Sequence, residues 1–400
     1  MASTRIVIAG ASLAGLRAAE ALRRAGFGGE VVLLGAEQHF PPYDRPPLSK
    51  QVLAGQWPAE RARLKHDDGL ALDVRPGTRA SGLDLAGQAV LLDGGGRAGF
   101  DGLIIATGAA PRRLPVPGAG LPGVHLLRTV DDCRGLTAAL RPGGTLVVIG
   151  AGFIGMEVAA TARGLGMSVT VVDPLPAPMI RAAGPELGAA VAALHEAHGV
   201  ACLLGRAVTG FTGETKSTGE TRLAGVAIDG GEVLPADAAV VAVGAAPQTG
   251  WLAGSGLHTD DGVVCDETLF AVGTGNVVAA GDVVRWQHPL LHRSLRVEHW
   301  TNAVSQAQAA ARNLHARLSG AGTAAPYDAL PYFWTDQYDW KLQVVGLPGE
   351  EMSIAEGSLA DGKLVAELRT GGELTGMACI NWPARLAACR RRLLQAGAAA

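Results

Sequence analysis

The sequence predicts an α/β protein with two doubly wound, mostly parallel β-sheets and a smaller α+β domain after them. Three observations predict this fold class. At 400 residues the chain is too long for one ordinary hydrophobic core. The segments 4–37 and 145–173 both read as strand, glycine turn, helix, strand. After Pro326 the pattern changes to separate strands and a final helix.

Each repeat begins with a strand that is apolar on both faces, which is typical of a buried parallel sheet. The expected elements of the two repeats are strands Arg5–Ala9 and Val31–Leu34 around helix Leu16–Ala25, and strands Leu146–Ile149 and Val169–Val172 around helix Gly155–Leu165. Further elements are expected at Leu103–Gly108, Ala239–Val243, residues 277–283 and helix Asn302–Ser319, with Pro111–Pro122 as a linker. The last domain is expected to hold strands Leu342–Val345, Leu364–Leu368 and Leu374–Ile380 and a helix near Arg385–Leu394.

The composition limits the class of protein. Hydrophobic residues make up 48% and charged residues 18%, a balance that favours a globular fold. A formal net charge of −3 argues against a nucleic-acid binder, and no apolar run is long enough to cross a bilayer. The five cysteines have no metal-ligand spacing, and His288 and His292 have no nearby partner that would complete a metal set. We therefore expect a soluble cytoplasmic protein without a metal site.

The sharpest motif lies between the strand and the helix of the second repeat. Gly150 permits a tight turn, Gly152 lets the backbone approach a pyrophosphate, and Gly155 lets helix and strand pack closely. A pyrophosphate would then bind at the helix N-terminus. Asp173 ends the next strand, where a carboxylate accepts hydrogen bonds from ribose hydroxyls and repels a 2′-phosphate. The pattern predicts a Rossmann-like domain that prefers NADH to NADPH.

The first repeat carries a weaker copy of this fingerprint, with Gly10, Ser12, Ala14 and Gly15 in its turn. Serine stands where the second glycine usually lies, so its Cβ narrows the approach to a phosphate while its hydroxyl can donate to one. Glu37 is the nearest acid after the second strand. Two dinucleotide sites in one chain predict hydride transfer between two cofactors, whereas a decayed internal duplication is the alternative.

Other strand ends fit a flavin. An Ala-Thr-Gly ending at Thr107 and Gly108 and a Gly-Asp ending at Gly281 and Asp282 follow apolar runs, while the matching strand Ala239–Val243 of the second repeat ends in Gly244. The second dinucleotide domain is thus inserted into the first. The expected boundaries are 1–112 with 240–322 for an FAD-binding domain, 113–239 for an NAD-binding domain and 323–400 for a C-terminal α+β interface domain.

Several longer motifs resemble one family across nearly the whole chain. They are Tyr43-Asp-Arg45-Pro-Pro-Leu-Ser-Lys50, Gly152-Phe-Ile154-Gly155-Met-Glu157, Ala280-Gly281-Asp282, Arg296-Val-Glu298-His-Trp300-Thr-Asn302 and Phe333-Trp334-Thr-Asp336-Gln337-Tyr338. The chain resembles FAD-dependent reductases that pass electrons from NADH to small ferredoxins, of the putidaredoxin reductase type. Their fold is shared with glutathione reductase and apoptosis-inducing factor.

The resemblance implies roles for individual residues. It implies that FAD is lined by Gly10, Ser12, Ala14, Gly15, Glu37, Arg45, Lys50, Ala80, Thr107, Gly108, Arg128, Gly281, Asp282 and Trp300. It implies that NAD is lined by Gly150, Gly152, Ile154, Gly155, Glu157, Asp173, Arg181 and Gly244. Lys50 and Glu157 would be the catalytic ion pair beside the flavin and the nicotinamide, where a lysine favours the reduced flavin.

The sequence departs from the family pattern in three places. Ser12 replaces a glycine, Ala36 stands where relatives often carry an acid for the FAD ribose, and Trp300 stands where some relatives carry an aliphatic residue. The first two bear on FAD affinity, and the third bears on flavin potential or access.

The function that the resemblance implies is electron transfer from NADH through FAD to a [2Fe–2S] ferredoxin that serves a cytochrome monooxygenase or a ring-hydroxylating oxygenase. A disulfide or peroxide reductase on the same scaffold would need a thiol beside the flavin, and the segment around Lys50 holds none. A third alternative is an NADH sensor similar to apoptosis-inducing factor. The arginine cluster at 385 and 390–392 is expected to be a solvated helix face, with steering of an acidic ferredoxin as its alternative. Either a monomer or a homodimer is compatible with the sequence.

Overall fold

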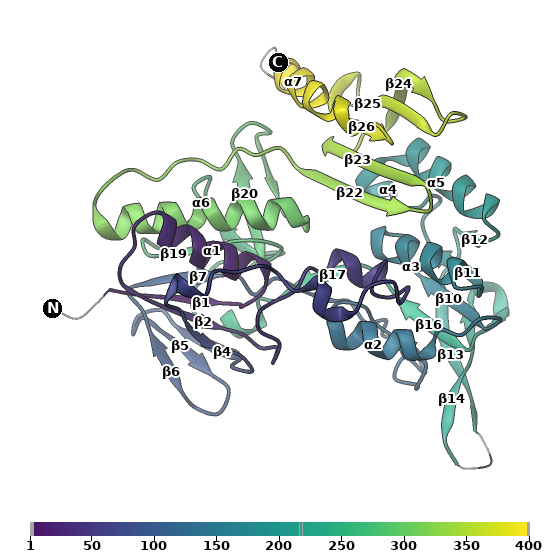
Figure 1. Ribbon diagram of the computed structural model, residues 1–400, viewed down its shortest axis with the longest axis horizontal. Coiled ribbons are helices and arrows are strands. Elements are labelled where there is room, and N and C mark those ends of the chain that lie inside the picture. Colours follow the sequence, from purple (N-terminus) through teal and green to yellow (C-terminus); the bar gives the residue numbers. More distant parts are fainter. Residues whose placement is uncertain (1–3, 216, 218, 398–400) are drawn as a thin grey trace. The chain divides into compact units, whose positions relative to one another are not determined.

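The structure is a computed structural model that describes residues 4–215, 217 and 219–397 (Figure 1). The chain divides into two compact units. The first comprises Met1–Asp44, Arg63–Ala110 and Ala246–Pro331, and the second comprises Arg45–Ala62, Pro111–Ala245 and Tyr332–Ala400. The predicted boundaries of three domains stay a prediction beside this division.

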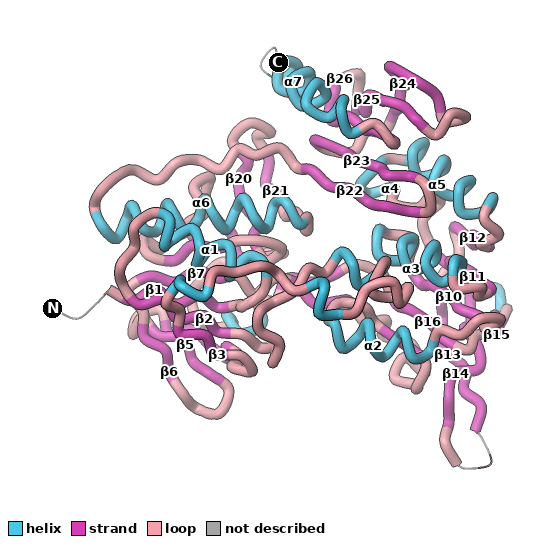
Figure 2. The backbone as a smooth tube through the Cα atoms, viewed as in Figure 1, coloured by secondary structure: helices cyan, strands magenta, loops and turns pink. Residues whose placement is uncertain are grey.

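The first unit contains a five-stranded parallel sheet in the order β19-β7-β1-β2-β3. Its strands are β1 (Arg5–Ala9), β2 (Glu30–Leu34), β3 (Asp73–Arg75), β7 (Gly102–Ile105) and β19 (Val277–Ala279). Helices α1 (Leu13–Arg24) and α6 (Trp300–Ser319) pack against each other beside this sheet (Figure 2). Two smaller sheets are formed by β4 (Ala80–Asp84), β5 (Ala89–Leu92) and β6 (Arg97–Gly99), and by β18 (Val263–Cys265), β20 (Val284–His288) and β21 (Arg293–Leu295).

The second unit repeats the parallel arrangement in the order β12-β11-β10-β16-β9. These strands are β9 (Val124–His125), β10 (Thr145–Ile149), β11 (Ser168–Asp173), β12 (Ala201–Leu204) and β16 (Ala238–Val241). The helices are α2 (Val130–Ala139), α3 (Phe153–Gly164), α4 (Ile180–Ala183) and α5 (Pro185–Ala197). An antiparallel sheet adds β13 (Val208–Thr215), β14 (Thr221–Ile228) and β15 (Val233–Pro235). The repeated pattern of the sequence therefore forms two parallel sheets, as predicted.

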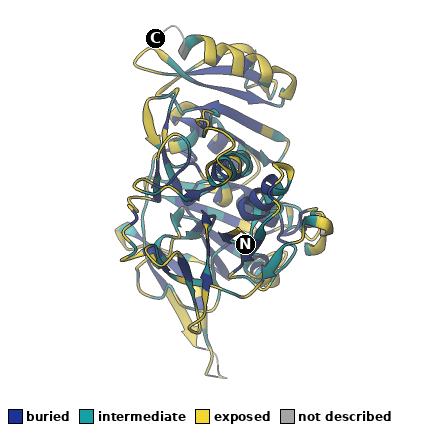
Figure 3. Ribbon diagram, turned by 90° about the vertical axis from the view of Figure 1, so that its left-hand side faces the viewer, coloured by how far each residue is buried: buried dark blue, intermediate teal, exposed yellow. Residues whose placement is uncertain are grey.

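The C-terminal part of the second unit is an antiparallel sheet in the order β22-β23-β26-β25-β24. Its elements are β22 (Tyr332–Gln337), β23 (Trp340–Gly346), β24 (Glu351–Ser358), β25 (Lys363–Thr370), β26 (Glu373–Ile380) and α7 (Leu386–Gly397). The sequence predicted β23, β25, β26 and the helix but not β22 and β24. Strand β24 is mostly exposed at the edge of the sheet, so it lacks the apolar signal of a buried strand. The helix next to the C-terminus is also largely exposed (Figure 3).

Short strands and 3₁₀ helices lie along the chain between the elements named above. They are β8 (Ala109–Pro111), β17 (Ala245–Pro247) and the 3₁₀ helices η1 (Pro46–Ser49), η2 (Ala59–Ala62), η3 (Asp68–Leu70), η4 (Asp229–Gly231), η5 (Gly250–Leu252) and η6 (Pro383–Arg385). The stretch Pro111–Pro122 is not a free linker, because Leu114, Val116 and Leu121 pack against the core of the second unit. The sequence failed to predict this packing because prolines and glycines interrupt the pattern of apolar residues in this stretch.

The arginine cluster at 385 and 390–392 is exposed, as expected for a solvated face, and three of its arginines also contact the C-terminal sheet. Arg392 pairs with the buried carboxylate of Glu367. Arg385 pairs with Glu356 at 2.5 Å, and the Arg390 guanidinium lies 5.1 Å from the Tyr332 ring centroid. These arginines therefore attach the helix to the C-terminal sheet.

His288 has a structural role. It ends β20 and is fully buried, with Nε2 3.2 Å from the Ala329 carbonyl oxygen. Its Nδ1 accepts the Leu290 backbone N–H at 3.2 Å. Over residues 4–215, 217 and 219–397, no three His, Cys, Asp or Glu side chains gather as a possible metal site. Within the same described ranges, no helix is both long and apolar enough to cross a membrane.

Candidate functional site

The turn between β10 and α3 is shaped by glycine for two different reasons. Gly150 has φ +102°, and a Cβ there would lie 2.5 Å from the Ala242 carbonyl oxygen. A Cβ on Gly155 would lie 1.9 Å from the Gly150 carbonyl oxygen, so the fold itself requires both glycines. A Cβ on Gly152, in contrast, would meet nothing closer than 4.0 Å. No contact of the fold therefore requires glycine at this position, and the close approach of a phosphate is the reason that the sequence motif supplies.

Asp173 belongs to the same turn. Its Oδ2 accepts the Ala151 backbone N–H at 2.7 Å, and its Oδ1 accepts the Leu175 N–H at 2.8 Å. Each oxygen keeps a further lone pair, because a carboxylate offers about four acceptor positions. The carboxylate therefore stands fixed at the carboxyl end of β11, beside the glycine turn.

The corresponding turn of the first unit has the same construction. Gly10 has φ +121°, and a Cβ there would lie 2.1 Å from the Ala106 carbonyl oxygen. A Cβ on Gly15 would lie 1.8 Å from the Gly10 carbonyl oxygen. Ser12 occupies the position equivalent to Gly152, precedes α1, and makes no side-chain capping hydrogen bond. Serine is thus compatible with the fold of this turn. Its side chain narrows the space beside the turn of the first unit, whereas Gly152 leaves the equivalent space in the second unit open.

Glu37 lies two residues after Gly35 and is oriented by an aromatic neighbour. The Tyr43 hydroxyl donates to Glu37 Oε2, and the Glu37 carbonyl oxygen accepts the Gly77 N–H at 3.0 Å. The contact with Tyr43 comes from the Tyr43-Asp-Arg45 motif, which brings Glu37 into the same loop region as that motif.

The other flavin candidates of the first unit lie at strand ends and at the start of α6. Thr107 Oγ1 donates to the Gln248 carbonyl oxygen at 2.9 Å, and Gly108 follows it. The Gly281 N–H donates to Gln306 Oε1 at 3.0 Å, and Asp282 follows it. The Trp300 indole Nε1–H donates to Asp44 Oδ1 at 2.8 Å. Ala80 lies at the start of β4.

The second unit brings Lys50 and Glu157 together. Lys50 Nζ lies 2.9 Å from Glu157 Oε1, and their side chains are 12% and 7% exposed. Glu157 lies in the second turn of α3, directly after the glycine turn. Lys50 and Glu157 lie far apart in the sequence, so local patterns do not predict their contact. The family resemblance alone predicted this pair. Ser49, whose Oγ donates to Glu157 Oε2 at 2.5 Å, was not predicted.

The segment that carries Lys50 is attached to two helices of the second unit. The Cys133 thiol of α2 lies 3.2 Å from the Leu48 carbonyl oxygen, and the Thr161 hydroxyl of α3 donates to the Ser49 carbonyl at 2.8 Å. The Arg45 guanidinium donates to the Arg128 carbonyl oxygen. These contacts fix the position of the segment from which the Lys50 side chain extends.

Three further NAD candidates have different surroundings. Ile154 is 38% exposed at the start of α3, Arg181 is exposed on α4, and Gly244 has φ +98° after β16. The Gly244 carbonyl oxygen accepts the Arg112 N–H at 2.9 Å. The structure thus places Gly150, Gly155 and Asp173 in one tight constellation, while Ile154 and Arg181 remain exposed.

The cysteines do not form a redox pair at this site. Cys133 contacts the Leu48 carbonyl oxygen in the second unit, and its burial raises the pKa of its thiol. A raised pKa lowers the fraction of reactive thiolate. Cys379 and Cys389 are 3.6 Å apart in the C-terminal sheet and α7, and both are free.

Comparison with known families identifies the scaffold. Residues 4–307 match the family model described as pyridine nucleotide-disulphide oxidoreductase, and residues 332–400 match the model described as reductase C-terminal. The chain belongs to the pyridine nucleotide-disulphide oxidoreductase family. It is thus an oxidoreductase of a family that uses FAD and NAD(H), as the sequence predicted.

Relatives of this family member are similar over nearly their whole length. Rhodocoxin reductase of Rhodococcus erythropolis is 39% identical over 97% of this chain and 89% of its own. Putidaredoxin reductase CamA of Pseudomonas putida is 34% identical over 96% of this chain and 90% of its own. A solved covalent putidaredoxin reductase–putidaredoxin complex matches with a TM-score of 0.90 and 31% identity, covering 99% of this chain and 94% of that one. The predicted resemblance and fold class are confirmed.

The residues present fit both cofactors of the family. The open space at Gly152 and the fixed acid Asp173 suit a pyrophosphate and a ribose without a 2′-phosphate. In the first unit the turn at Gly10 and Gly15 has the same glycine geometry, with Ser12 as its one narrower position, and the acid Glu37 is held by Tyr43. Each unit thus has one glycine turn of the dinucleotide-binding type.

Proposed function

We propose that this protein is an NADH-dependent, FAD-containing reductase that delivers electrons singly to a [2Fe–2S] ferredoxin serving a cytochrome monooxygenase or a ring-hydroxylating oxygenase. The observation that carries the proposal is the buried Lys50–Glu157 ion pair directly after the NAD-type glycine turn. The full-length similarity to rhodocoxin reductase and putidaredoxin reductase supports ferredoxin as the class of acceptor.

We assign the predicted residues to two sites. The FAD site takes Gly10, Ser12, Ala14, Gly15, Glu37, Arg45, Lys50, Ala80, Thr107, Gly108, Arg128, Gly281, Asp282 and Trp300. The NAD site takes Gly150, Gly152, Ile154, Gly155, Glu157, Asp173, Arg181 and Gly244. Bound FAD supplies the hydride acceptor and the means to release electrons one at a time.

The chain's own residues bind and orient the reactants. N–H groups at the start of α3 are available to a pyrophosphate, and Asp173 accepts ribose hydroxyls. Lys50 supplies a positive charge where negative charge develops, and Glu157 keeps that ammonium in place through a 2.9 Å contact. Because both side chains are mostly shielded from water, their attraction is screened less than at the surface.

The test is reduction of cytochrome c driven by NADH, with and without an added [2Fe–2S] ferredoxin, on protein of known flavin content. We expect strong stimulation by ferredoxin and much faster turnover with NADH than with NADPH. Reduction of the bound flavin without stimulation by any ferredoxin of a broad panel would contradict the proposed acceptor. A reduced flavin that then persists for minutes in air would indicate an NADH sensor instead.

A further inference from the structure

The Glu157 carboxylate is held by more than Lys50. Ser49 Oγ donates to Oε2 at 2.5 Å, and Thr335 Oγ1 donates to Oε1 at 2.8 Å. Thr335 is distant in sequence from Glu157, on β22 of the C-terminal sheet, and it is 1% exposed. The C-terminal sheet therefore contacts the proposed catalytic pair directly.

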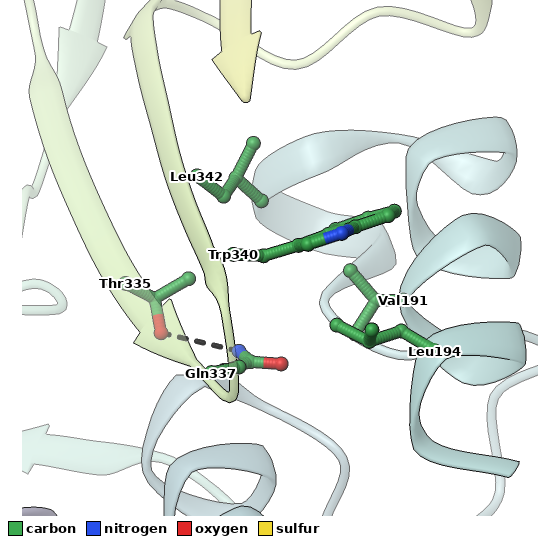
Figure 4. Close-up of a pocket in the computed structure, with 6 residues that line it drawn as sticks. All are labelled: Val191, Leu194, Thr335, Gln337, Trp340 and Leu342. Atoms are coloured by element: carbon green, nitrogen blue, oxygen red, sulfur yellow. Dashed lines mark hydrogen bonds between the residues drawn. The ribbon is translucent and has the colours of Figure 1, made fainter. Parts of the chain in front are cut away.

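Thr335 is in turn bonded to a buried amide. Gln337 Nε2 donates to Thr335 Oγ1 at 3.1 Å, as Figure 4 shows. Gln337 Oε1 lies 2.9 Å from Nε2 of His195, a fully buried residue of α5. The pocket beside Thr335 and Gln337 has apolar walls that include Leu194 and Trp340, and it has no room for a water molecule (Figure 4). Water on that side does not compete for these hydrogen bonds.

The chemistry of these groups determines the direction of every bond in the chain. An amide nitrogen only donates, so Thr335 Oγ1 is an acceptor toward Gln337. The single hydroxyl proton of Thr335 is then available for Glu157. The amide oxygen of Gln337 only accepts, so His195 carries its proton on Nε2.

We propose that His195, Gln337 and Thr335 form a one-way chain of hydrogen-bond donors that positions the Glu157 carboxylate for Lys50. The three are positioning residues, since they act through Glu157. This inference rests on the proposed function of the Lys50–Glu157 pair and assigns the C-terminal sheet a part in that site.

The chain restricts the carboxylate in a way that Lys50 alone does not. Donors on both oxygens, Ser49 on Oε2 and Thr335 on Oε1, oppose rotation of the carboxylate about its terminal bond. The ammonium of Lys50 meets the same Oε1 that Thr335 holds. Loss of the Thr335 hydroxyl therefore changes the position of the Lys50 ammonium. The glycine turn at Gly150 and the Asp173 carboxylate should not change.

The first test reads the direction of the chain and needs no turnover. Burial lowers the pKa of His195 to about 4, so the ring is neutral at pH 7. Long-range ¹H–¹⁵N spectra of histidine-labelled, oxidised protein without NADH distinguish the two neutral tautomers. We expect the Nε2–H form for His195, assigned with a His195→Gln variant. The Nδ1–H form would overturn the proposal, because Gln337 would then donate to His195 instead of to Thr335.

The second test measures the effect on Glu157 with Thr335→Val, which keeps the shape and removes the hydroxyl. Stopped-flow reduction of the bound flavin by NADH should slow by roughly tenfold, as for one lost hydrogen bond to a charged group. NAD⁺ affinity from titration calorimetry should change little. Thr335→Ser should restore most of the rate, which a loss of packing alone does not predict.

Thr375→Val is the matched control, because the Thr375 hydroxyl donates to the Pro348 carbonyl at 3.1 Å in the same sheet and does not contact Glu157. Its reduction rate should equal that of the wild type. Equal rates for the wild type and Thr335→Val would overturn the relay alone. A wild-type protein that NADH does not reduce would instead contradict the proposed function, with the tautomer measurement still deciding the direction of the chain.

Discussion

At the scale of single residues, Asp173 combines a structural contact with a proposed binding role. Its two oxygens hold backbone N–H groups of Ala151 and Leu175 and so help to shape the glycine turn. The remaining lone pairs of the two oxygens suit the two ribose hydroxyls of NADH. A phosphate on that ribose would face a fixed negative charge.

We predict that Asp173→Ala lowers the preference for NADH over NADPH by roughly ten- to hundredfold, the range for loss of hydrogen bonds to a charged group. The measurement is the ratio of kcat/KM for the two cofactors. Asp237→Ala is the control, because Asp237 also accepts a backbone N–H, from Thr145 at 2.8 Å, but at the amino end of β10. An unchanged ratio for Asp173→Ala would mean that Asp173 is not the ribose ligand.

At the scale of elements, α5 and β22 are joined by a buried polar contact. His195 is fully buried and bonds only through Nε2 to Gln337, while its Nδ1 has no hydrogen-bond partner among the described residues. Neutral histidine tolerates such a position better than its charged form, because burial penalises the charge. The stability of this contact therefore depends on pH.

The pKa of His195 is about 4 in the folded chain, below the value of ~6.5 of an unperturbed histidine. Between these values the unfolded chain binds a proton that the folded chain does not. The free energy of unfolding therefore falls as pH falls through this window, by at most roughly 3 kcal/mol at pH ~4. Denaturation of the wild type and of His195→Gln from pH 7.5 to ~4.5 should give a difference that shrinks or reverses below pH ~6.5. Parallel curves of unfolding free energy against pH for the two proteins would contradict this prediction. Other buried histidines do not affect the comparison, because both proteins contain them.

Helix α7 and η6 directly before it are attached to the sheet by ion pairs of unequal burial. The side chain of Glu367 is 8% exposed and meets Arg392 and Arg369, whereas the Arg385–Glu356 pair is 45% and 43% exposed. Removal of a donor from a buried carboxylate costs more than removal of a surface partner.

We predict that Arg392→Ala lowers the free energy of unfolding by about 1–2 kcal/mol and Arg385→Ala by less than about 0.5 kcal/mol. Thermal unfolding of the two variants at one pH and salt concentration compares them, and the two serve as controls for each other. A larger loss for Arg385→Ala would show that burial of Glu367 does not decide how α7 is held.

At the scale of the whole molecule, each unit carries one glycine turn of the dinucleotide-binding type. The turn of the first unit has serine at its second position, and the turn of the second unit keeps glycine there. The proposal assigns FAD to the first and NADH to the second, so the two ligands should protect different segments.

Hydrogen–deuterium exchange of the FAD-loaded protein tests this assignment. Addition of NAD⁺ should slow exchange at residues 150–157 and 168–175 and leave residues 10–16 unchanged, because bound phosphates engage N–H groups at the start of a helix. ADP-ribose, which lacks the nicotinamide, should give the same protection. Protection of residues 10–16 by NAD⁺ would reverse the assignment of the two turns.

The sequence by itself determined the parts of this protein that depend on local spacing. The need for Gly15 and Gly155 is local, since a Cβ on either would strike the carbonyl oxygen of Gly10 or Gly150 in the same turn. Helix and strand periods likewise predicted the two parallel sheets. The exposed strand β24 and the packed proline stretch Pro111–Pro122 escaped because their apolar signals are weak or interrupted.

Only the tertiary structure decided what surrounds Glu157. Lys50 was predicted through a family motif, whereas Ser49 and Thr335 were not assigned a role, although Thr335 lies inside a motif that the resemblance used. These donors lie 108 and 178 residues from Glu157 along the chain. A sequence pattern reports which face of an element is buried, but it does not state which buried polar groups meet. That pairing is determined by the packing of β22 against α3 and α5, because a buried donor or acceptor must find its partner wherever the fold places one.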